Sequence, residues 1–229
     1  MASGELPSRV GVLCGAAAAA REPYREFARE LGVRLGRAGV GLVHGGVAAG
    51  LVGVAVRAVV TAGGEVISVV PHWLLRAEDG PIRRRQVHVV RTITDQQRLV
   101  HRLADGFVVL PGGLDTLDQF CAVVARHDMA KPVVVANQNG YFDPLLAQLD
   151  RAVAEAFVTP ARRGAIESAT TMDGVLRGLA GRAASVDGQG VRGPDEAAHG
   201  GWYVGRADQQ AAVGRGDETL LGRLVDQPQ

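Results

Sequence analysis

Runs of apolar, mostly β-branched residues alternate along this chain with longer stretches whose apolar residues recur at helical spacing. Most of these runs end at glycine or proline, which indicates a turn at the end of each strand. Because parallel strands need long crossover connections, which helices normally supply, the alternation predicts an α/β fold. We expect a Rossmann-like, doubly wound parallel sheet with helices on both faces. The predicted strands span residues 9–14, 40–44, 65–70, 87–90, 105–110 and 133–136.

The stretches between the strands predict helices, because their apolar residues recur every three or four positions. Residues 72–85 are predicted to form a loop, and Thr94 with Asp95 is expected to cap the helix that follows. In doubly wound sheets ligands bind outside the carboxyl ends of the strands, so the turns after the first three strands should meet in one crevice. The predicted helices span approximately residues 22–38, 50–62, 95–104, 116–129 and 145–156.

The fifth predicted strand leads into the turn that carries the main candidate site. Its β-forming run stops at Pro111-Gly112-Gly113, and a helical pattern follows. Such a turn places backbone N–H groups at a helix N-terminus, where anions bind. The turn is therefore a candidate phosphate cradle, and Gly45-Gly46 after the second strand is a second glycine-rich turn of this kind.

The segment from Pro111 to Gln119 resembles the signature Pro-Gly-Gly-x-Gly-Thr-x-x-Glu of the Lonely Guy (LOG) family. Asp115 stands at the third glycine of that signature, and Gln119 stands at its glutamate. Residues 42–46 with 50–53, 95–98 and 139–158 are similar to other family motifs in the same order, so the resemblance covers roughly residues 9–180. It implies a Rossmann-like fold and a nucleoside 5'-monophosphate phosphoribohydrolase, commonly a homodimer with its crevice near the interface.

The resemblance also implies roles for individual residues. Gly112, Gly113 and Thr116, with Gly45 and Gly46 in the second turn, are candidates for binding substrate or phosphate.

Arg98 is the candidate charged contact at the ribose or phosphate, and Gln119 occupies the position of the catalytic glutamate. Cleavage of an N-glycosidic bond builds positive charge on the sugar, which an ionised carboxylate stabilises or attacks. The neutral amide of Gln119 performs neither role well.

Asp115 is the carboxylate that could replace the missing glutamate, and two interpretations of it stay open. It is either an N-cap whose oxygen accepts from the N–H groups of Leu117 or Asp118, or a side chain that projects into the crevice as a catalytic or ligand-binding group. A fixed carboxylate 4 Å from a phosphate costs about 1 to 4 kcal/mol, depending on the effective dielectric. This cost suggests a ligand without a 5'-phosphate, or a phosphate that is bound weakly.

Two functional hypotheses follow. The first is a LOG-like hydrolase that releases a purine-type or modified base from a nucleotide or nucleoside, with Arg98, Asp115 and Gln119 as its candidate catalytic residues and an altered substrate. The alternative is a non-hydrolytic nucleotide-binding or repurposed homologue. An NAD-type dehydrogenase is disfavoured, because no Gly-x-Gly-x-x-Gly follows the first strand.

Composition limits the partners that we expect. The net charge of +1 and the aromatic content of 4% argue against nucleic acid. No apolar run approaches the roughly 20 residues of a membrane span, and residues 1–9 lack the pattern of a signal peptide. Cys14 and Cys121 have no metal-ligand spacing, so we expect neither metal nor cofactor. A nucleotide or nucleoside ligand, a homodimer and a cytoplasmic location are the expectations.

The chain divides by composition into two parts. Residues 1–184 are predicted to form the LOG-like Rossmann domain, whereas residues 185–229 have no sustained apolar period and are predicted to be an irregular tail. Trp202-Tyr203-Val204 is an apolar exception that could dock on the body or on a neighbouring subunit. His44, at the end of the second strand, is expected to be structural.

Overall fold

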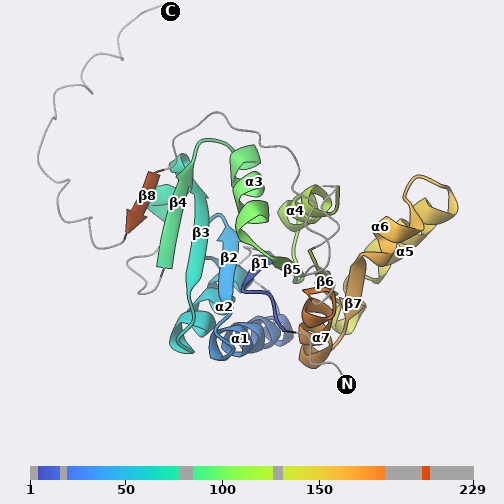
Figure 1. The fold of residues 1–229 in the computed structure, drawn as a ribbon, viewed down its shortest axis with the longest axis horizontal. Helices are drawn as coiled ribbons and strands as arrows, with labels where there is room; N and C mark the ends of the chain where they lie inside the picture. Colours follow the sequence, from blue (N-terminus) through green and yellow to red (C-terminus); the bar gives the residue numbers. More distant parts are fainter. Residues whose placement is uncertain (1–4, 16–19, 78–84, 126–130, 184–202, 207–229) are drawn as a thin grey trace, which may run out of the picture.

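The computed structural model describes residues 5–15, 20–77, 85–125, 131–183 and 203–206. They form an eight-stranded sheet in the order β7-β6-β5-β1-β2-β3-β4-β8, flanked by helices (Figure 1). The elements follow the chain as β1 (Arg9–Leu13), α1 (Glu22–Arg37), β2 (Gly41–Gly45), α2 (Gly50–Thr61), β3 (Val66–Pro71), η1 (His72–Ala77), β4 (Arg85–Val90), α3 (Ile93–Leu103), β5 (Gly106–Val109), α4 (Leu114–Ala125), β6 (Val133–Ala136), η2 (Gln138–Gly140), α5 (Asp143–Ala154), α6 (Pro160–Gly164), β7 (Ile166–Ala169), α7 (Met172–Ala183) and β8 (Tyr203–Arg206).

The strands β1 to β7 are all parallel to their neighbours, and β8 alone runs antiparallel, along β4. The predicted doubly wound parallel sheet is confirmed, and each of the six predicted strands is present. The two edge strands β7 and β8 were not predicted. The sequence of β7, Ile-Glu-Ser-Ala, explains this, because only its first residue is a buried aliphatic residue.

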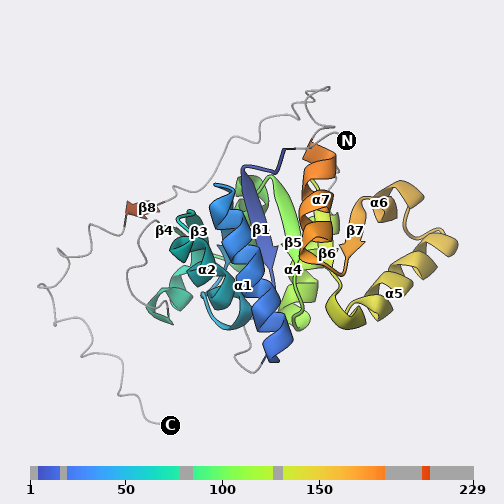
Figure 2. The same cartoon turned by 90° about the horizontal axis from the view of Figure 1, so that it is seen from below.

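Helices cover both faces of the sheet, as predicted. One buried cluster joins β1, β2 and β6 to α1, α2 and α7, and Figure 2 shows α1 and α7 in front of the sheet. A second cluster on the opposite face joins the sheet to α3, α4 and α5. On the face that carries α1 and α2, these two helices pack closely at Gly36. A Cβ added at Gly36 would stand only 2.7 Å from the carbonyl oxygen of Val59, so a larger residue would push the helices apart.

Several predicted boundaries were wrong by a few residues. The helix α3 begins at Ile93 and its cap is Thr92, whose hydroxyl oxygen accepts from the N–H of Asp95 at 3.0 Å, so Thr94 is already inside the helix. The predicted loop over residues 72–85 contains the 3-10 helix η1 and the first residue of β4. The helix α4 begins at Leu114 rather than Thr116, and its predicted end at Met129 lies outside the described residues.

Part of the predicted tail lies on the body of the protein. Tyr203–Arg206 pairs with β4, with Tyr203 opposite Val89 and Val204 opposite His88. Trp202 and the remainder of residues 185–229 lie outside the described residues, so the boundary at residue 184 stays a prediction. Within the described ranges, no helix combines the length and apolar character that a membrane crossing requires.

Candidate functional site

The candidate site lies where the direction of the sheet reverses. From β1 the chain moves outward through β2, β3 and β4, and then returns to add β5 on the other side of β1. The carboxyl ends of β1 and β5 therefore flank a topological switch point, which is where doubly wound sheets bind ligands. The Pro-Gly-Gly turn follows β5 at this point.

Backbone hydrogen bonds tie the loops at this edge together. The N–H of Gly15, after β1, donates to the carbonyl of Pro111 at 3.3 Å, and the N–H of Leu51, at the start of α2, donates to the carbonyl of Gly15 at 3.1 Å. The N–H of Gly46 donates to the carbonyl of Val69 at 2.9 Å, which fixes the loop after β2 against β3. The predicted meeting is therefore seen for the turns after β1 and β2, whereas the bond to Val69 involves β3 itself and not the turn that follows it.

Gly112 and Thr116 form the floor of the turn after β5. A Cβ added at Gly112 would meet the Thr116 hydroxyl and would stand 2.6 Å from the backbone nitrogen of Gly15, so only glycine fits there. Thr116 is fully buried, and its Oγ1 has no hydrogen-bond partner among the described residues. A buried hydroxyl without a partner costs free energy, and the turn beside it is where a ligand could satisfy it.

The N-terminus of α4 adds donors to the same turn. The carbonyl of Gly113 accepts from the N–H groups of Thr116 and Leu117, both at 3.1 Å, so Gly113 occupies the cap position. The N–H groups that precede Thr116 in the helix have no acceptor within the helix and carry its positive dipole end. Together with the Thr116 hydroxyl, they make an arrangement suited to an anion.

A tyrosine-rich rim borders this turn, and the sequence analysis did not single it out. The hydroxyl of Tyr141 donates to the carbonyl of Gly112 at 2.7 Å, and its ring packs edge-to-face on Tyr24, with centroids 5.8 Å apart. Arg21 donates to the Tyr24 hydroxyl at 3.1 Å. Asn139 and Gly140 have positive φ of 56° and 68°, and the turn that they form leads directly into Tyr141.

Asp115 lies in the first turn of α4 and is exposed. The N-cap interpretation of this residue is wrong, because the helix begins one residue earlier and Gly113 takes the cap position. Arg98 is exposed on α3. No hydrogen bond or ion pair joins Arg98 to Asp115 within the part of the chain that the structure describes, so a single chain does not bring these two candidates into contact.

Gln119 lines a small cavity between α3 and α4. Gly45 and Gln96 also line it, so the structure brings the glutamate position of the motif and the second glycine turn together. Gln96 donates to the carbonyl of Val69 at 2.9 Å and lies against Gly45, where an added Cβ would stand 3.1 Å from its amide carbon. Sequence reasoning missed Gln96, although it belongs to the motif that carries Arg98.

His44 belongs to a buried network on the face of the sheet that packs on α1 and α2. Its Nε2 lies 2.7 Å from the Ser68 hydroxyl, which accepts from Arg85 Nε at 2.7 Å. Burial, reinforced by the charge of Arg85 and opposed by the backbone of Gly45, lowers the pKa of His44 to about 3. His44 is therefore neutral near pH 7, and its Nε2 shares a hydrogen bond with the Ser68 hydroxyl. This network supports the predicted structural role.

The two cysteines lie in different environments. Burial raises the pKa of the Cys14 thiol far above its usual value, which keeps it protonated as a core residue. Cys121 is exposed on α4. Among the described residues, no group of three or more His, Cys, Asp or Glu side chains is placed to hold a metal ion.

Comparison with known proteins gives sequence relatives over most of the chain. The model of a family described as "Possible lysine decarboxylase" matches residues 52–179. A probable cytokinin riboside 5'-monophosphate phosphoribohydrolase of Oryza sativa subsp. japonica is 40% identical over 70% of this chain and 72% of its own length. The cytokinin riboside 5'-monophosphate phosphoribohydrolase of Rhodococcoides fascians is 30% identical over 76% of this chain and 89% of its own.

Solved structures share the fold at lower identity. The molybdenum cofactor carrier protein of Chlamydomonas reinhardtii is 22% identical, covers 78% of this chain and 98% of its own, and has a TM-score of 0.55. The molybdenum cofactor binding protein of Rippkaea orientalis is 21% identical over 72% of this chain and 91% of its own, with a TM-score of 0.52. At this identity the likeness establishes a common architecture.

Proposed function

Because this chain belongs to the Lonely Guy (LOG) family, we propose that it is a hydrolase that cleaves the N-glycosidic bond of a nucleotide, releasing a purine-type or modified base from ribose 5-phosphate. The relatives named above are phosphoribohydrolases of cytokinin riboside 5'-monophosphates, and the chain covers more than two thirds of each. The altered motif at Asp115 and Gln119 points to a substrate that differs from theirs.

The observation that carries the proposal is the unsatisfied Thr116 hydroxyl beneath Gly112. In the proposed complex, Gly112, Gly113 and Thr116 hold the 5'-phosphate, and Gly45 and Gly46 border the same crevice. Asp115 opposes the phosphate, but it is exposed. In a water-like environment the repulsion of two charges 4 Å apart falls to about 1 kcal/mol, which the helix N–H donors can offset.

The bond cleavage requires a group that stabilises the positive charge developing on the ribose ring. Gln119 cannot supply a negative charge, so Asp115 takes that role in our proposal and Arg98 binds the ribose or phosphate oxygens. Gln119 orients the substrate by hydrogen bonding from the cavity beside Gly45. Water accepts the glycosyl group, and the base leaves with a proton.

A second candidate function rests on Gln119 alone. If no other carboxylate replaces the missing glutamate, the same crevice binds a nucleotide without hydrolysing it. Substrate turnover separates this alternative from the hydrolase.

We also propose a cytoplasmic homodimer. The side chain of Leu114, next to the phosphate turn, is 83% exposed, and that of Phe157, beyond α5, is 86% exposed. Single exposed apolar side chains are common on protein surfaces, so the dimer is proposed from the family resemblance, with Leu114 and Phe157 as positions that a second copy would cover. A second copy that covered Leu114 would exclude water from the crevice and could bring a charged residue toward Asp115.

The test is base release from a panel of nucleoside 5'-monophosphates and the matching nucleosides, followed by liquid chromatography. Asp115→Asn should lower the rate of release at least tenfold. Asp118→Asn is the matched control, because the carboxylate of Asp118 accepts from Gln97 at 2.6 Å and has no proposed role in the reaction. Equal rates for the two variants would refute the role of Asp115, and no release from any substrate by wild type would favour the second candidate.

A further inference from the structure

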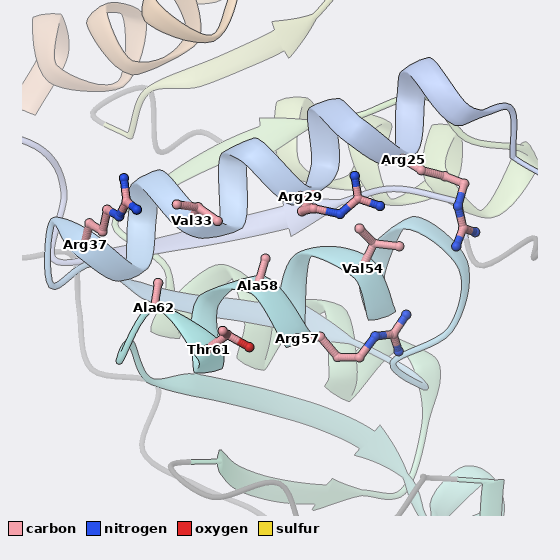
Figure 3. Close-up of a pocket in the computed structure, with 9 residues that line it drawn as sticks. All are labelled: Arg25, Arg29, Val33, Arg37, Val54, Arg57, Ala58, Thr61 and Ala62. Carbon is pink, nitrogen blue, oxygen red and sulfur yellow. The ribbon is translucent and has the colours of Figure 1, made fainter.

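A groove of about 600 Å³ runs along the outer surface of α1 and α2 (Figure 3). Four of its nine lining residues are arginines. The lining residues are Arg25, Arg29, Val33, Arg37, Val54, Arg57, Ala58, Thr61 and Ala62. Its size falls in the range of small-molecule sites, which is about 300 to 1,000 Å³.

The spacing of the arginines follows from the helix. Arg25, Arg29 and Arg37 stand four, eight and twelve residues apart on α1, and all three line the groove, with Val33 between Arg29 and Arg37. At 1.5 Å per residue, this row extends over about 18 Å from Arg25 to Arg37. Arg57 adds a guanidinium group from α2, and Figure 3 shows its head directed toward the same end of the groove as that of Arg25.

The groove has an excess of positive charge that its own acidic residues do not neutralise. Glu22 lies 3.3 Å from Arg25 Nε and 3.5 Å from Arg29 Nη2, so it is shared between these two side chains. Arg37 and Arg57 form no ion pair within the described ranges. The chain as a whole has a net charge of only +1, so the positive charge of the groove belongs to this surface and not to the protein in general. Guanidinium groups without an acidic partner attract an anion that binds in the groove.

The chemistry of the lining restricts the class of anion. Arginine binds phosphate with two parallel hydrogen bonds, which favours phosphate groups over a diffuse negative charge. A single phosphate cannot reach guanidinium groups spread over about 18 Å, whereas a chain of linked phosphates can contact several. None of the nine lining residues is aromatic, so the groove lacks the stacking surfaces with which proteins bind single-stranded nucleic acid.

We propose that the α1–α2 groove is a binding site for a ligand with two or more linked phosphates, separate from the crevice at the strand ends. Arg57 and Arg25, whose head groups lie at the same end of the groove, hold the phosphate chain, and Arg25 exchanges Glu22 for it. Arg29, one turn farther along α1, adds a third contact. Val33, Val54 and Ala58 form an apolar floor, which can contact an apolar group attached to the phosphate chain. The ligand is either an inorganic polyphosphate or a nucleoside triphosphate.

The test is calorimetric titration of the full chain with sodium tripolyphosphate, in the presence of AMP at a concentration expected to saturate the crevice. Arg57→Gln should raise the dissociation constant at least tenfold, because a charge-assisted hydrogen-bonded pair with the phosphate chain is lost. The matched control is Arg177→Gln, which removes the same charge from an exposed position on α7 outside the groove. It should change the dissociation constant less than twofold.

Titrations with orthophosphate and with ATP test whether linked phosphates are required and which kind of ligand carries them. Orthophosphate should bind at least tenfold more weakly than tripolyphosphate. ATP binding that depends on Arg57 would identify a nucleoside triphosphate as the source, and its absence alongside tripolyphosphate binding would identify the inorganic chain; either outcome supports the site.

Equal effects of the two substitutions, equal affinity for orthophosphate, or no binding of tripolyphosphate would overturn the proposal. Arg25→Gln provides a second variant should Arg57→Gln lower the stability of the fold. Because Arg57 and Arg25 have no role in the proposed hydrolysis, failure of this site leaves the proposed hydrolase unaffected, and failure of AMP to bind leaves this site unaffected.

Discussion

Gly112 and Gly113 are adjacent glycines in the same turn, and the structure predicts very different consequences for replacing each with alanine. At Gly112 the new methyl group would collide with the Thr116 hydroxyl and approach within 2.6 Å of Gly15 nitrogen and 2.7 Å of Thr116 Cβ. All of these atoms lie in or beside fixed backbone, so the loops after β1 and β5 must move apart. At Gly113 an added methyl group meets nothing within 4 Å.

The expected magnitudes follow from these contacts. Forcing a methyl group into closely packed structure costs about 1 to 3 kcal/mol, and we expect Gly112→Ala near the upper end because two loops are displaced. For a chain of this size, that loss lowers the melting temperature by roughly 5 to 10 °C. Gly113→Ala exchanges one cap residue for a poorer one and should cost about 1 kcal/mol or less.

The assay is urea denaturation of both variants beside wild type, with AMP titration of each folded variant. Gly112→Ala should show the larger loss of unfolding free energy and at least a tenfold loss of AMP affinity. If the two variants unfold alike and bind AMP alike, the geometry of the Pro111-Gly112-Gly113 turn is incorrect.

Three further predictions concern side chains of the site and the core. Thr116→Val should leave the free energy of unfolding in urea denaturation unchanged or raise it, because it removes a buried hydroxyl that has no partner among the described residues, but should weaken AMP binding about tenfold in titration; a large loss of stability would contradict this. Tyr141→Phe removes the bond to the Gly112 carbonyl, so we expect a loss of about 1 kcal/mol of unfolding free energy and slower base release; unchanged values for both would count against the rim. The folded-state pKa of His44, about 3, lies below the value of 6.5 for an unperturbed histidine, so the unfolded state binds more protons between these pH values. Stability should therefore fall as pH decreases below about 6.5, by up to about 1.4 kcal/mol per unit from this group, and His44→Gln should show a shallower decline in urea denaturation at pH 7, 6 and 5; an identical slope would refute the assignment.

The sequence predicted the sheet well because its central strands are buried on both faces. Their continuous Val, Ile and Leu runs and the glycine turns between them are strong signals of a parallel sheet. The edge strand β7 mixes polar and apolar residues and lacks such a run. Its register depends on pairing with β6, which no local pattern reveals.

The site was predicted in part for a similar reason. The Pro-Gly-Gly turn is encoded within a few residues, so its position at the end of β5 could be predicted, whereas its contact with the loop after β1 was found only in the structure. The contact of Tyr141 with Gly112 joins residues 29 positions apart, and the groove combines side chains of two helices. These arrangements are set by tertiary packing, which a reading of local spacing does not capture.

The central claim is that the crevice at the β1–β5 switch point hydrolyses a nucleotide. The most direct measurement is to incubate wild-type protein with AMP and with N6-modified adenosine 5'-monophosphates, and to quantify both the free base and ribose 5-phosphate over time, with Gly112→Ala as the inactive control. We predict that at least one of these nucleotides yields base and ribose 5-phosphate in equal amounts, and that Gly112→Ala yields neither. Nucleotide that binds to the wild-type protein and is recovered intact would contradict the account.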